Sequence, residues 1–441
     1  MDQKPDKSIP RLEIYLNHSV LVQAEGKQRF EEGQPTNEAE QRLAKIRSAL
    51  ESGYLDKLVS ECRSPDIKID PLDEKAVQLL TQLVDSVTSE VGRGIVGLTV
   101  LQLAIKAICP EQSIRLHKCG GRGENFSWQD GLPMRVLDKK YNTPVLRKYN
   151  LVKLNADGCF MTRSLAENYP YSQLYKAASR GGKEEWLAIL DMVEFNKVNP
   201  ATALKQLVTM LFNRSDIFNK DSELAMKAVN TVAGKLENLN QATKFIRSFV
   251  DSSTYAARLF EIAMHSLFQV LEDHEAFEDG FLKKLSQMRS ANKKHGNIGD
   301  IEITGGKRDS LHILESWDAK YGKAYLRDEM EELHEKLQEH PEVKLAAFVV
   351  DQNPNLKPEI KKRIEELEQN HNVRIEIVEF DDWVSRQAKR ISLPAKQTAN
   401  LWLIAFAESL CQLRRERAPI DEPADSWVRE LRAFVESFSS K

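Results

Sequence analysis

Two carboxylates and a lysine stand at positions where they could bind a metal ion and attack a phosphate ester. Asp300 begins a run that alternates polar and apolar residues, which is typical of a half-buried strand. Glycines and polar residues at 305–310 favour a turn, and the next run reads as a second strand that ends at Asp318 and Lys320. Because side chains alternate along a strand, Asp318 and Lys320 leave the same face. A hairpin of these strands would bring Asp300 near both.

This cluster predicts hydrolysis of a phosphodiester. Two carboxylates, Asp300 and Asp318, can hold Mg²⁺ and leave positions open for water and a phosphate. The metal lowers the pKa of its water and neutralises charge on the phosphoryl oxygens. The ammonium of Lys320 can orient the water or stabilise the charge that builds on the phosphoryl group. We therefore expect Asp300 and Asp318 to bind metal and Lys320 to be catalytic.

The pattern Asp300…Asp318-x-Lys320 resembles the motif of the PD-(D/E)xK nucleases, above all the type II restriction endonucleases. An expected amphipathic helix at 254–271 precedes the motif and carries Glu261, where that family often has an acidic helix residue. The elements expected after the motif are a helix at 325–338, a strand at 343–350, a helix at 358–368 and a strand at 373–380.

The resemblance covers roughly residues 250–390, and it departs from the family at Gly299, where the family has a proline before its first aspartate. It implies a Mg²⁺-dependent endonuclease that acts on double-stranded DNA, with Glu261 as a possible catalytic helper. One such site cuts one strand, so a homodimer on a palindromic sequence is expected. A restriction enzyme also implies a DNA methyltransferase that protects the host.

Composition limits the class of protein. A chain of 441 residues with 29% charged and 41% hydrophobic residues is long enough for two or three ordinary globular domains. Its net charge of −3 neither indicates nor excludes nucleic-acid binding, because local charge decides that. The five cysteines are widely spaced without a CxxC, which favours reduced thiols. The start of the chain has no apolar signal core and no run is long enough for a membrane span, so we expect a cytoplasmic protein.

Basic residues gather in the stretch 114–163, which holds ten Lys/Arg against four Asp/Glu and has glycines and aromatic residues between them. Such a segment suits a DNA duplex, because cations contact phosphates and glycines allow close approach of the backbone. The alternative is a solvated, loop-rich surface with its aromatic residues packed below. The DNA contacts predicted here are Arg115, Lys118, Arg122, Asn125, Lys139, Lys140, Arg147 and Lys148.

Helices dominate the expected structure of the N-terminal half, after one strand-like run at 12–16. The expected helices are 37–62, 73–91, 95–108, 172–178, 184–193, 200–212, 222–236 and 241–250, with a break at the glycines of 92–94. The first three resemble a helix-turn-helix fold and equally any helical bundle. Two further helices, 396–414 and 424–438, are expected after the nuclease-like region.

Together these features predict an α+β/α multi-domain protein with a mostly helical N-terminal half and a C-terminal α/β PD-(D/E)xK nuclease core on a mixed central sheet. The expected domains are a locally basic DNA-recognition region at 1–165, a helical connector at 166–250, the nuclease core at 251–392, and helices at 393–441 that pack on the core or on a dimer partner.

The expected function is sequence-specific, Mg²⁺-dependent cleavage of double-stranded DNA. Two alternatives stay open. One is a related nuclease that acts in repair or on modified or branched DNA. The other is a non-catalytic nucleic-acid-binding helical scaffold in which Asp318 and Lys320 form a surface ion pair.

Overall fold

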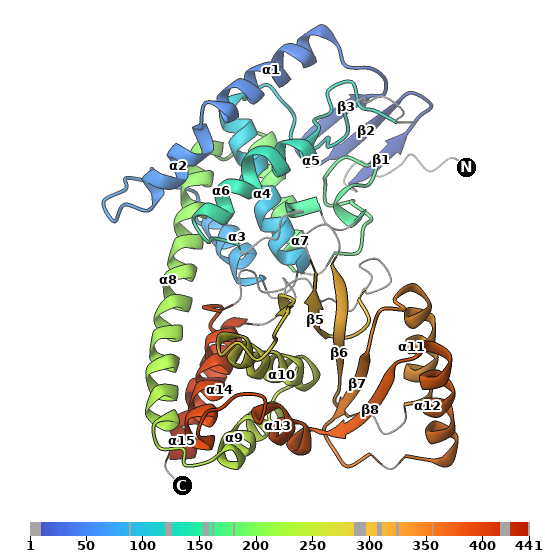
Figure 1. Cartoon of the computed structure of the whole chain (residues 1–441). Coiled ribbons are helices and arrows are strands. Elements are labelled where there is room, and N and C mark those ends of the chain that lie inside the picture. Colours follow the sequence, from blue (N-terminus) through green and yellow to red (C-terminus); the bar gives the residue numbers. More distant parts are fainter. Residues whose placement is uncertain are drawn as a thin grey trace, which may run out of the picture. The chain divides into compact units, whose positions relative to one another are not determined.

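The computed structural model (Figure 1) shows an α+β protein, mostly helical, with one three-stranded antiparallel sheet and one five-stranded mixed sheet in the C-terminal part. It describes residues 10–87, 90–119, 126–152, 158–160, 163–179, 181–285, 297–306, 311–322, 326–354, 356–414 and 424–439. The chain divides into two compact units, Met1–Ile217 with Pro419–Pro423 and Phe218–Ala418 with Ala424–Lys441.

The first unit combines a small sheet with a helical bundle. Its sheet has the order β1-β2-β3 and was expected only as one short strand. The strands are β1 (Arg11–Ile14), β2 (His18–Gln23) and β3 (Gly26–Glu31). The helices are α1 (Asn37–Glu51), α2 (Tyr54–Cys62), α3 (Glu74–Asp85), α4 (Glu90–Ile108), α5 (Met134–Leu137), the π-helix Asp138–Asn142, α6 (Thr143–Lys148), α7 (Lys183–Glu194) and the first part of α8 (Pro200–Ala233).

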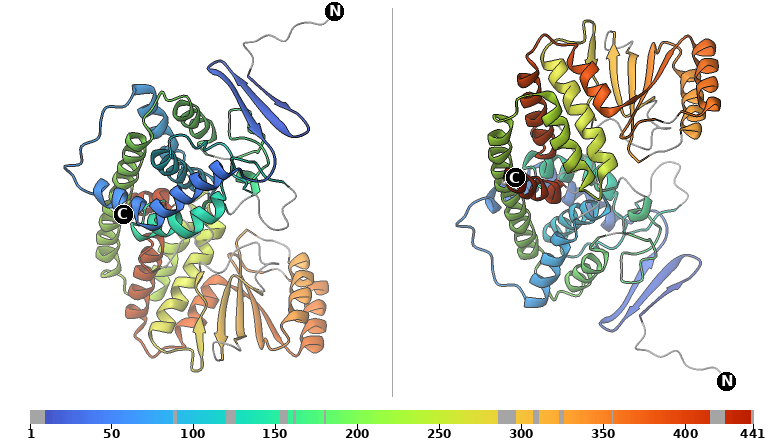
Figure 2. Two further views of the ribbon diagram at one scale, coloured as in Figure 1. Left: turned by 90° about the horizontal axis from the view of Figure 1, so that it is seen from above. Right: turned by 90° about the horizontal axis from the view of Figure 1, so that it is seen from below.

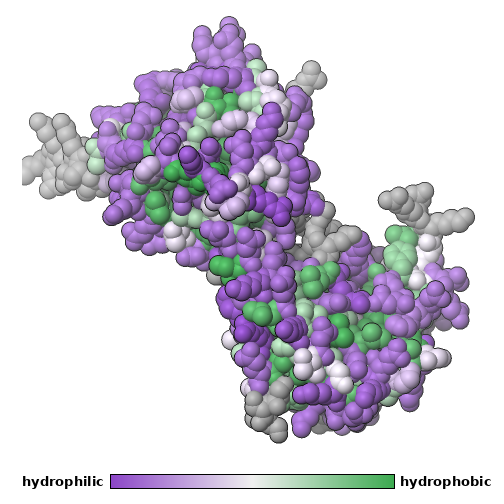
Figure 3. Space-filling view, turned by 90° about the vertical axis from the view of Figure 1, so that its left-hand side faces the viewer, coloured by the Kyte–Doolittle hydropathy of each residue, from purple (hydrophilic) through white to green (hydrophobic). Residues whose placement is uncertain are grey.

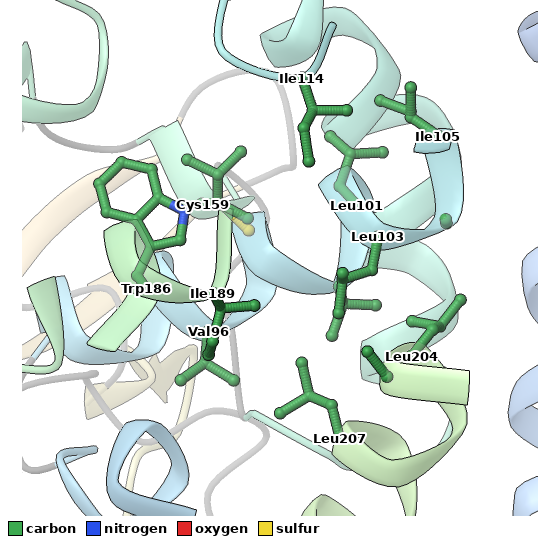
Figure 4. Packing of buried hydrophobic residues seen from close by; sticks show 14 of the residues in the cluster. Val96, Leu101, Leu103, Ile105, Ile114, Cys159, Trp186, Ile189, Leu204 and Leu207 are labelled. Carbon is green, nitrogen blue, oxygen red and sulfur yellow. The ribbon is translucent and has the colours of Figure 1, made fainter. Parts of the chain in front are cut away.

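Helix α4 forms the centre of the first unit (Figure 4). Its residues from Ile95 to Ile105 are buried, and Leu101 belongs to the same core as Trp186 of α7 and Leu204 of α8. A helix buried on all sides cannot present a face to a DNA groove, so the helix-turn-helix interpretation fails for α4.

The predicted break at 92–94 is wrong, because α3 ends at Asp85 and these glycines lie inside α4. A Cβ atom on Gly94 would lie 2.9 Å from the carbonyl oxygen of Cys159. The glycine therefore allows the backbone of 158–160 to approach α4 closely and does not end a helix.

Three other helix predictions also fail. The helix expected at 37–62 is two helices, α1 and α2, because Gly53 between them has a left-handed backbone (φ 83°). The helices expected at 200–212 and 222–236 are one continuous helix, α8, because the polar residues between them include no glycine or proline to interrupt it. The helix expected at 172–178 is a series of turns. Carbonyls in that stretch accept hydrogen bonds from the Lys183 ammonium, at Tyr175 (2.6 Å) and Ala177 (2.7 Å), and do not need helical partners.

The second unit is built on the mixed sheet β4-β5-β6-β7-β8, in which the first three strands are antiparallel and the last three are parallel. The strands are β4 (Gly280–Leu282), β5 (Ile301–Gly305), β6 (His312–Lys320), β7 (Leu345–Val350) and β8 (Arg374–Glu379). The helices are α9 (Leu239–Asp251), α10 (Ala256–Asp273), α11 (Arg327–Glu339), α12 (Pro358–His371), α13 (Phe380–Ala388), α14 (Ala395–Leu410) and α15 (Ala424–Ser439).

Helices cover both faces of this sheet (Figures 1 and 2). Alternate residues of β7 divide between the two layers: Ala347 and Val349 belong to the core with α9, α10, α13, α14 and α15, whereas Ala346 and Phe348 belong to the core with α11 and α12. The predicted helices and strands from α10 to β8 are present in the predicted order, and β4 between α10 and β5 and α13 after β8 are additions to it. The two C-terminal helices pack into the larger of these cores.

The surface shown in Figure 3 is mainly hydrophilic, with apolar residues scattered over it. No helix in the described part of the chain is long and apolar enough to cross a membrane.

Candidate active site

The pairing of β5 with β6 brings the predicted acidic residues together. Ile301 pairs with Trp317, which sets Asp300, just before β5, beside Asp318 near the end of β6. Asp300 and Asp318 lie close enough for each carboxyl group to influence the pKa of the other. Oδ2 of Asp300 also accepts a hydrogen bond of 3.0 Å from the backbone N–H of Ala319. The expected hairpin strands are confirmed; its turn residues, 307–310, lie outside the described residues.

The structure explains why residue 299 is a glycine in this chain. A Cβ atom at this position would lie 2.5 Å from Oγ of Ser316 and 3.0 Å from the carbonyl oxygen of Trp317. Proline also carries a Cβ, so a proline here would displace the Ser316 side chain and crowd the backbone of β6. The departure from the resembled family thus follows from how closely the segment before Asp300 approaches β6.

The two aspartates form a site with a deficit of positive charge. Burial raises the pKa of Asp300, and the negative charge of Glu261 raises it further. Burial also raises the pKa of Asp318 well above its usual range, with the charge of Asp300 adding to the effect. Two adjacent buried carboxylates resist ionising together unless a cation lies between them. A divalent cation would supply that charge.

Lys320 supplies part of the missing charge from the same face of β6. Its Nζ lies 2.9 Å from Oδ2 of Asp318 and 2.7 Å from Oε2 of Glu329, a residue of α11. Burial alone would lower the pKa of Lys320, but the charge of Asp318 and hydrogen bonds to both carboxylates raise it above its usual value. The side chain is therefore an ammonium that donates hydrogen bonds.

Glu261 lies on α10, where only 8% of its surface is exposed. Its carboxylate forms an ion pair with Arg258, one turn earlier, and its charge reaches Asp300. The structure thus brings this predicted residue into the electrostatic surroundings of the aspartates. His265, one turn later, makes a 3.1 Å contact through Nε2 with the carbonyl oxygen of Lys283.

A buried ion pair that sequence reasoning missed supports the segment before Asp300. Glu302 is fully buried, and its Oε2 lies 2.8 Å from Nζ of Lys283. Its other oxygen accepts a 2.6 Å hydrogen bond from the backbone N–H of Ile298. Nζ of Lys283 also donates to Oδ1 of Asn297 at 2.5 Å. Glu302 therefore anchors residues 297–298, which lead into Asp300. The sequence offered no signal for this pair, because the strand before Lys283, β4, was not predicted.

The predicted DNA contact at Arg115 is wrong. The side chain is fully buried, and its guanidinium lies 2.6 Å from the carboxylate of Asp191. It also donates hydrogen bonds to the carbonyl oxygen of Tyr171 (2.7 Å) and to the side chain of Gln28 (2.8 Å). A guanidinium with these partners stabilises the first unit from inside and is not available to a phosphate.

Acidic residues from other segments also reduce the local charge of the basic stretch. Lys140 pairs with Glu51 at 3.1 Å, and Lys148 pairs with Asp56 at 2.8 Å. The excess of cations counted along the sequence is therefore smaller on the folded surface. These two lysines are exposed, but each already has a counter-charge.

The remaining predicted contacts divide into three groups. Lys139 is exposed, while Lys118 and Arg147 are half-buried. Arg122 and Asn125 lie outside the described residues. The aromatic residues Phe126 and Trp128 pack with Leu21 and Phe30 of the small sheet. This packing agrees with the alternative interpretation of the basic stretch, a solvated surface with its aromatic residues packed below.

The donor set at the aspartates fits Mg²⁺. Among the described residues there is no group of three or more His, Cys, Asp or Glu side chains placed to hold a metal. Mg²⁺ does not require one, because it is usually held by one or two carboxylates and keeps several waters or phosphate oxygens as ligands. Asp300 and Asp318 meet that requirement.

Comparison with known proteins does not assign the chain: no protein-family model matches it, and no curated protein is similar to it in sequence. Function is therefore inferred from the site itself.

Proposed function

We propose that this protein is a Mg²⁺-dependent endonuclease that cuts double-stranded DNA at a specific sequence, as type II restriction enzymes do. The observation that carries the proposal is the convergence of Asp300, Asp318 and Lys320 at one end of the β5–β6 pair. The order α10-β5-β6-α11-β7 supports it, because the elements expected with the resemblance to the PD-(D/E)xK nucleases are a helix, a hairpin, a helix and a strand in that order.

The residues have distinct tasks in this proposal. Asp300 and Asp318 would hold Mg²⁺, and the N–H of Ala319 fixes the orientation of the Asp300 carboxylate. Bound Mg²⁺ supplies an activated water and neutralises charge on the phosphate. Lys320 donates hydrogen bonds to the attacking water or to a phosphoryl oxygen, and its ammonium stabilises the charge that develops there. Glu261 adds negative potential near Asp300.

The substrate and assembly belong to the same proposal. The first unit would contact DNA phosphates through cations such as Lys139, Lys118 and Arg147. One site cuts one strand, so a homodimer would make the double-strand break, and a DNA methyltransferase would protect the host's own sites.

Cleavage of unmethylated phage DNA tests the proposal. Wild-type protein with Mg²⁺ is expected to produce discrete bands, and these should be absent with EDTA or with Asp318→Ala. Asp279→Ala is the matched control, since Asp279 is an exposed acid of the same unit. Bands that persist in Asp318→Ala would contradict the assignment of the site.

The ion pair between Asp318 and Lys320 favours one other function, a non-catalytic nucleic-acid-binding scaffold. A structural ion pair needs a single carboxylate, however. Here Asp300 places a second negative charge against the first in a half-buried site, which destabilises a metal-free protein. That arrangement is expected of a cation site. A repair nuclease would differ by cutting modified or branched DNA without a fixed sequence.

A further inference from the structure

The ammonium of Lys320 is held from two sides by carboxylates of different elements. Asp318 lies two residues earlier on the same strand, and Glu329 lies on α11, which begins after β6. All three side chains are about 15% exposed, so the group is largely shielded from water. Nζ of Lys320 also lies 5.8 Å from the centre of the Phe348 ring, which closes a third side.

The two carboxylates differ in what else they must do. In the proposed function Asp318 binds a divalent cation. The cation offsets the negative charge of Asp318, which weakens its attraction for the Lys320 ammonium, and also repels that ammonium directly. A lysine has four rotatable side-chain bonds, so a weakened partner would let Nζ move away from the aspartates. Glu329 belongs to another element and is not a proposed metal ligand, so its hold on Nζ does not weaken in this way.

We propose that Glu329 is a positioning residue that keeps Nζ of Lys320 beside the Asp300–Asp318 pair. This inference rests on the proposed function for its effect on cleavage, but the contact itself can be tested without DNA. Glu329 acts through Lys320 and does not touch the phosphate.

A purely structural role for Glu329 has to be separated from positioning. Glu329 stands in the first turn of α11, where any carboxylate interacts favourably with the helix dipole. Asp328 stands in the same turn and is exposed. Asp328→Ala therefore removes the same charge from the helix end and serves as the matched control.

The first measurement is the rate at which an amine-specific reagent modifies Lys320 in the metal-free full-length protein, followed by peptide mass spectrometry. Glu329→Ala is expected to raise this rate at least about fivefold, because Nζ loses one of its two carboxylate partners. Asp328→Ala should leave the rate within about twofold of wild type. Glu329→Gln retains an acceptor oxygen and should lie between them, and it replaces the alanine variant if that variant does not fold.

The second measurement is steady-state cleavage of DNA with Mg²⁺. Glu329→Ala should lower kcat about 100-fold with KM changed less than about twofold, since misplacement of a catalytic group affects the transition state more than substrate binding. Glu329→Gln should lose no more than about tenfold, and Asp328→Ala should cleave like wild type.

The outcomes separate the two proposals. An unchanged modification rate of Lys320 in Glu329→Ala overturns the positioning role, as do equal effects of Glu329→Ala and Asp328→Ala. Full cleavage activity in Glu329→Ala overturns it too. If the modification rate rises as expected and wild-type protein cuts no DNA, the proposed function fails while the positioning of Lys320 stands.

Discussion

Replacing Asp300 with asparagine should stabilise the metal-free protein while removing its response to Mg²⁺. Asparagine has the same shape, and its Oδ1 can still accept the hydrogen bond from Ala319. The change removes the negative charge of Asp300, which is repelled by Glu261 and which raises the pKa of Asp318. A residue kept for function at the expense of stability behaves in this way.

The expected gain in stability of the metal-free protein follows from the raised pKa of both aspartates. A carboxyl group whose pKa is higher in the folded than in the unfolded protein favours folding when protonated, so this contribution is present below about pH 4 and is lost as the pH rises through the folded-state pKa. The metal-free pair is therefore less stable above the folded-state pKa of its carboxyl groups than at low pH. Two like charges 4 Å apart repel by about 4 kcal/mol at an effective dielectric of 20. Attraction to Lys320 offsets part of this, which leaves an expected gain of about 1–3 kcal/mol for Asp300→Asn.

Thermal unfolding followed by circular dichroism measures this gain. In EDTA, Asp300→Asn should unfold at a temperature higher by about 2–4 °C for each kcal/mol gained. With Mg²⁺ at about ten times its Kd, wild type should gain about 1.4 kcal/mol and the variant should gain almost nothing. Asp279→Asn, an exposed change in the same unit, should stay within about 0.5 kcal/mol of wild type in both conditions. A variant less stable than wild type in EDTA, or equal Mg²⁺ stabilisation of both, would refute the assignment of a repulsive metal-binding pair.

Three further changes test other parts of the structure. Burial lowers the pKa of His117 to about 4, so its neutral form is favoured in the folded protein; stability should fall by about 2 kcal/mol between pH 7.5 and pH 5, and urea unfolding of His117→Phe should lack that loss. The same loss in the variant would show that other groups cause it. Glu302→Ala should destabilise the second unit by about 3 kcal/mol in urea unfolding, because Lys283 loses its buried partner; a loss below about 1 kcal/mol would argue against an anchoring role. In DNA-binding titrations Lys139→Ala should reduce the salt dependence of affinity by about one ion, whereas Arg115→Ala should lower stability without that change; the reverse pattern would place Arg115 at the DNA.

Local sequence patterns predicted much of the second unit. Alternation along β6 placed Asp318 and Lys320 on one face, and a turn-forming segment predicted that β5 and β6 pair. Apolar periodicity located α10, α11 and β7 in the correct order. These features depend on residues that are neighbours in sequence, so periodicity and turn chemistry are enough to find them.

Tertiary structure decided which charged groups meet. Arg115 reads as a surface cation in a basic stretch, yet its partner is Asp191 from a separate helix. No local pattern identifies the partners of Glu302 or Glu329, yet one anchors the segment before Asp300 and the other holds Lys320. The partner of a charged side chain depends on how segments that are distant in the sequence pack together, and local sequence patterns do not show which segments meet. The sequence by itself determined the residues and the hairpin of the candidate site, and the packing of the helices around it decided which carboxylates surround the lysine.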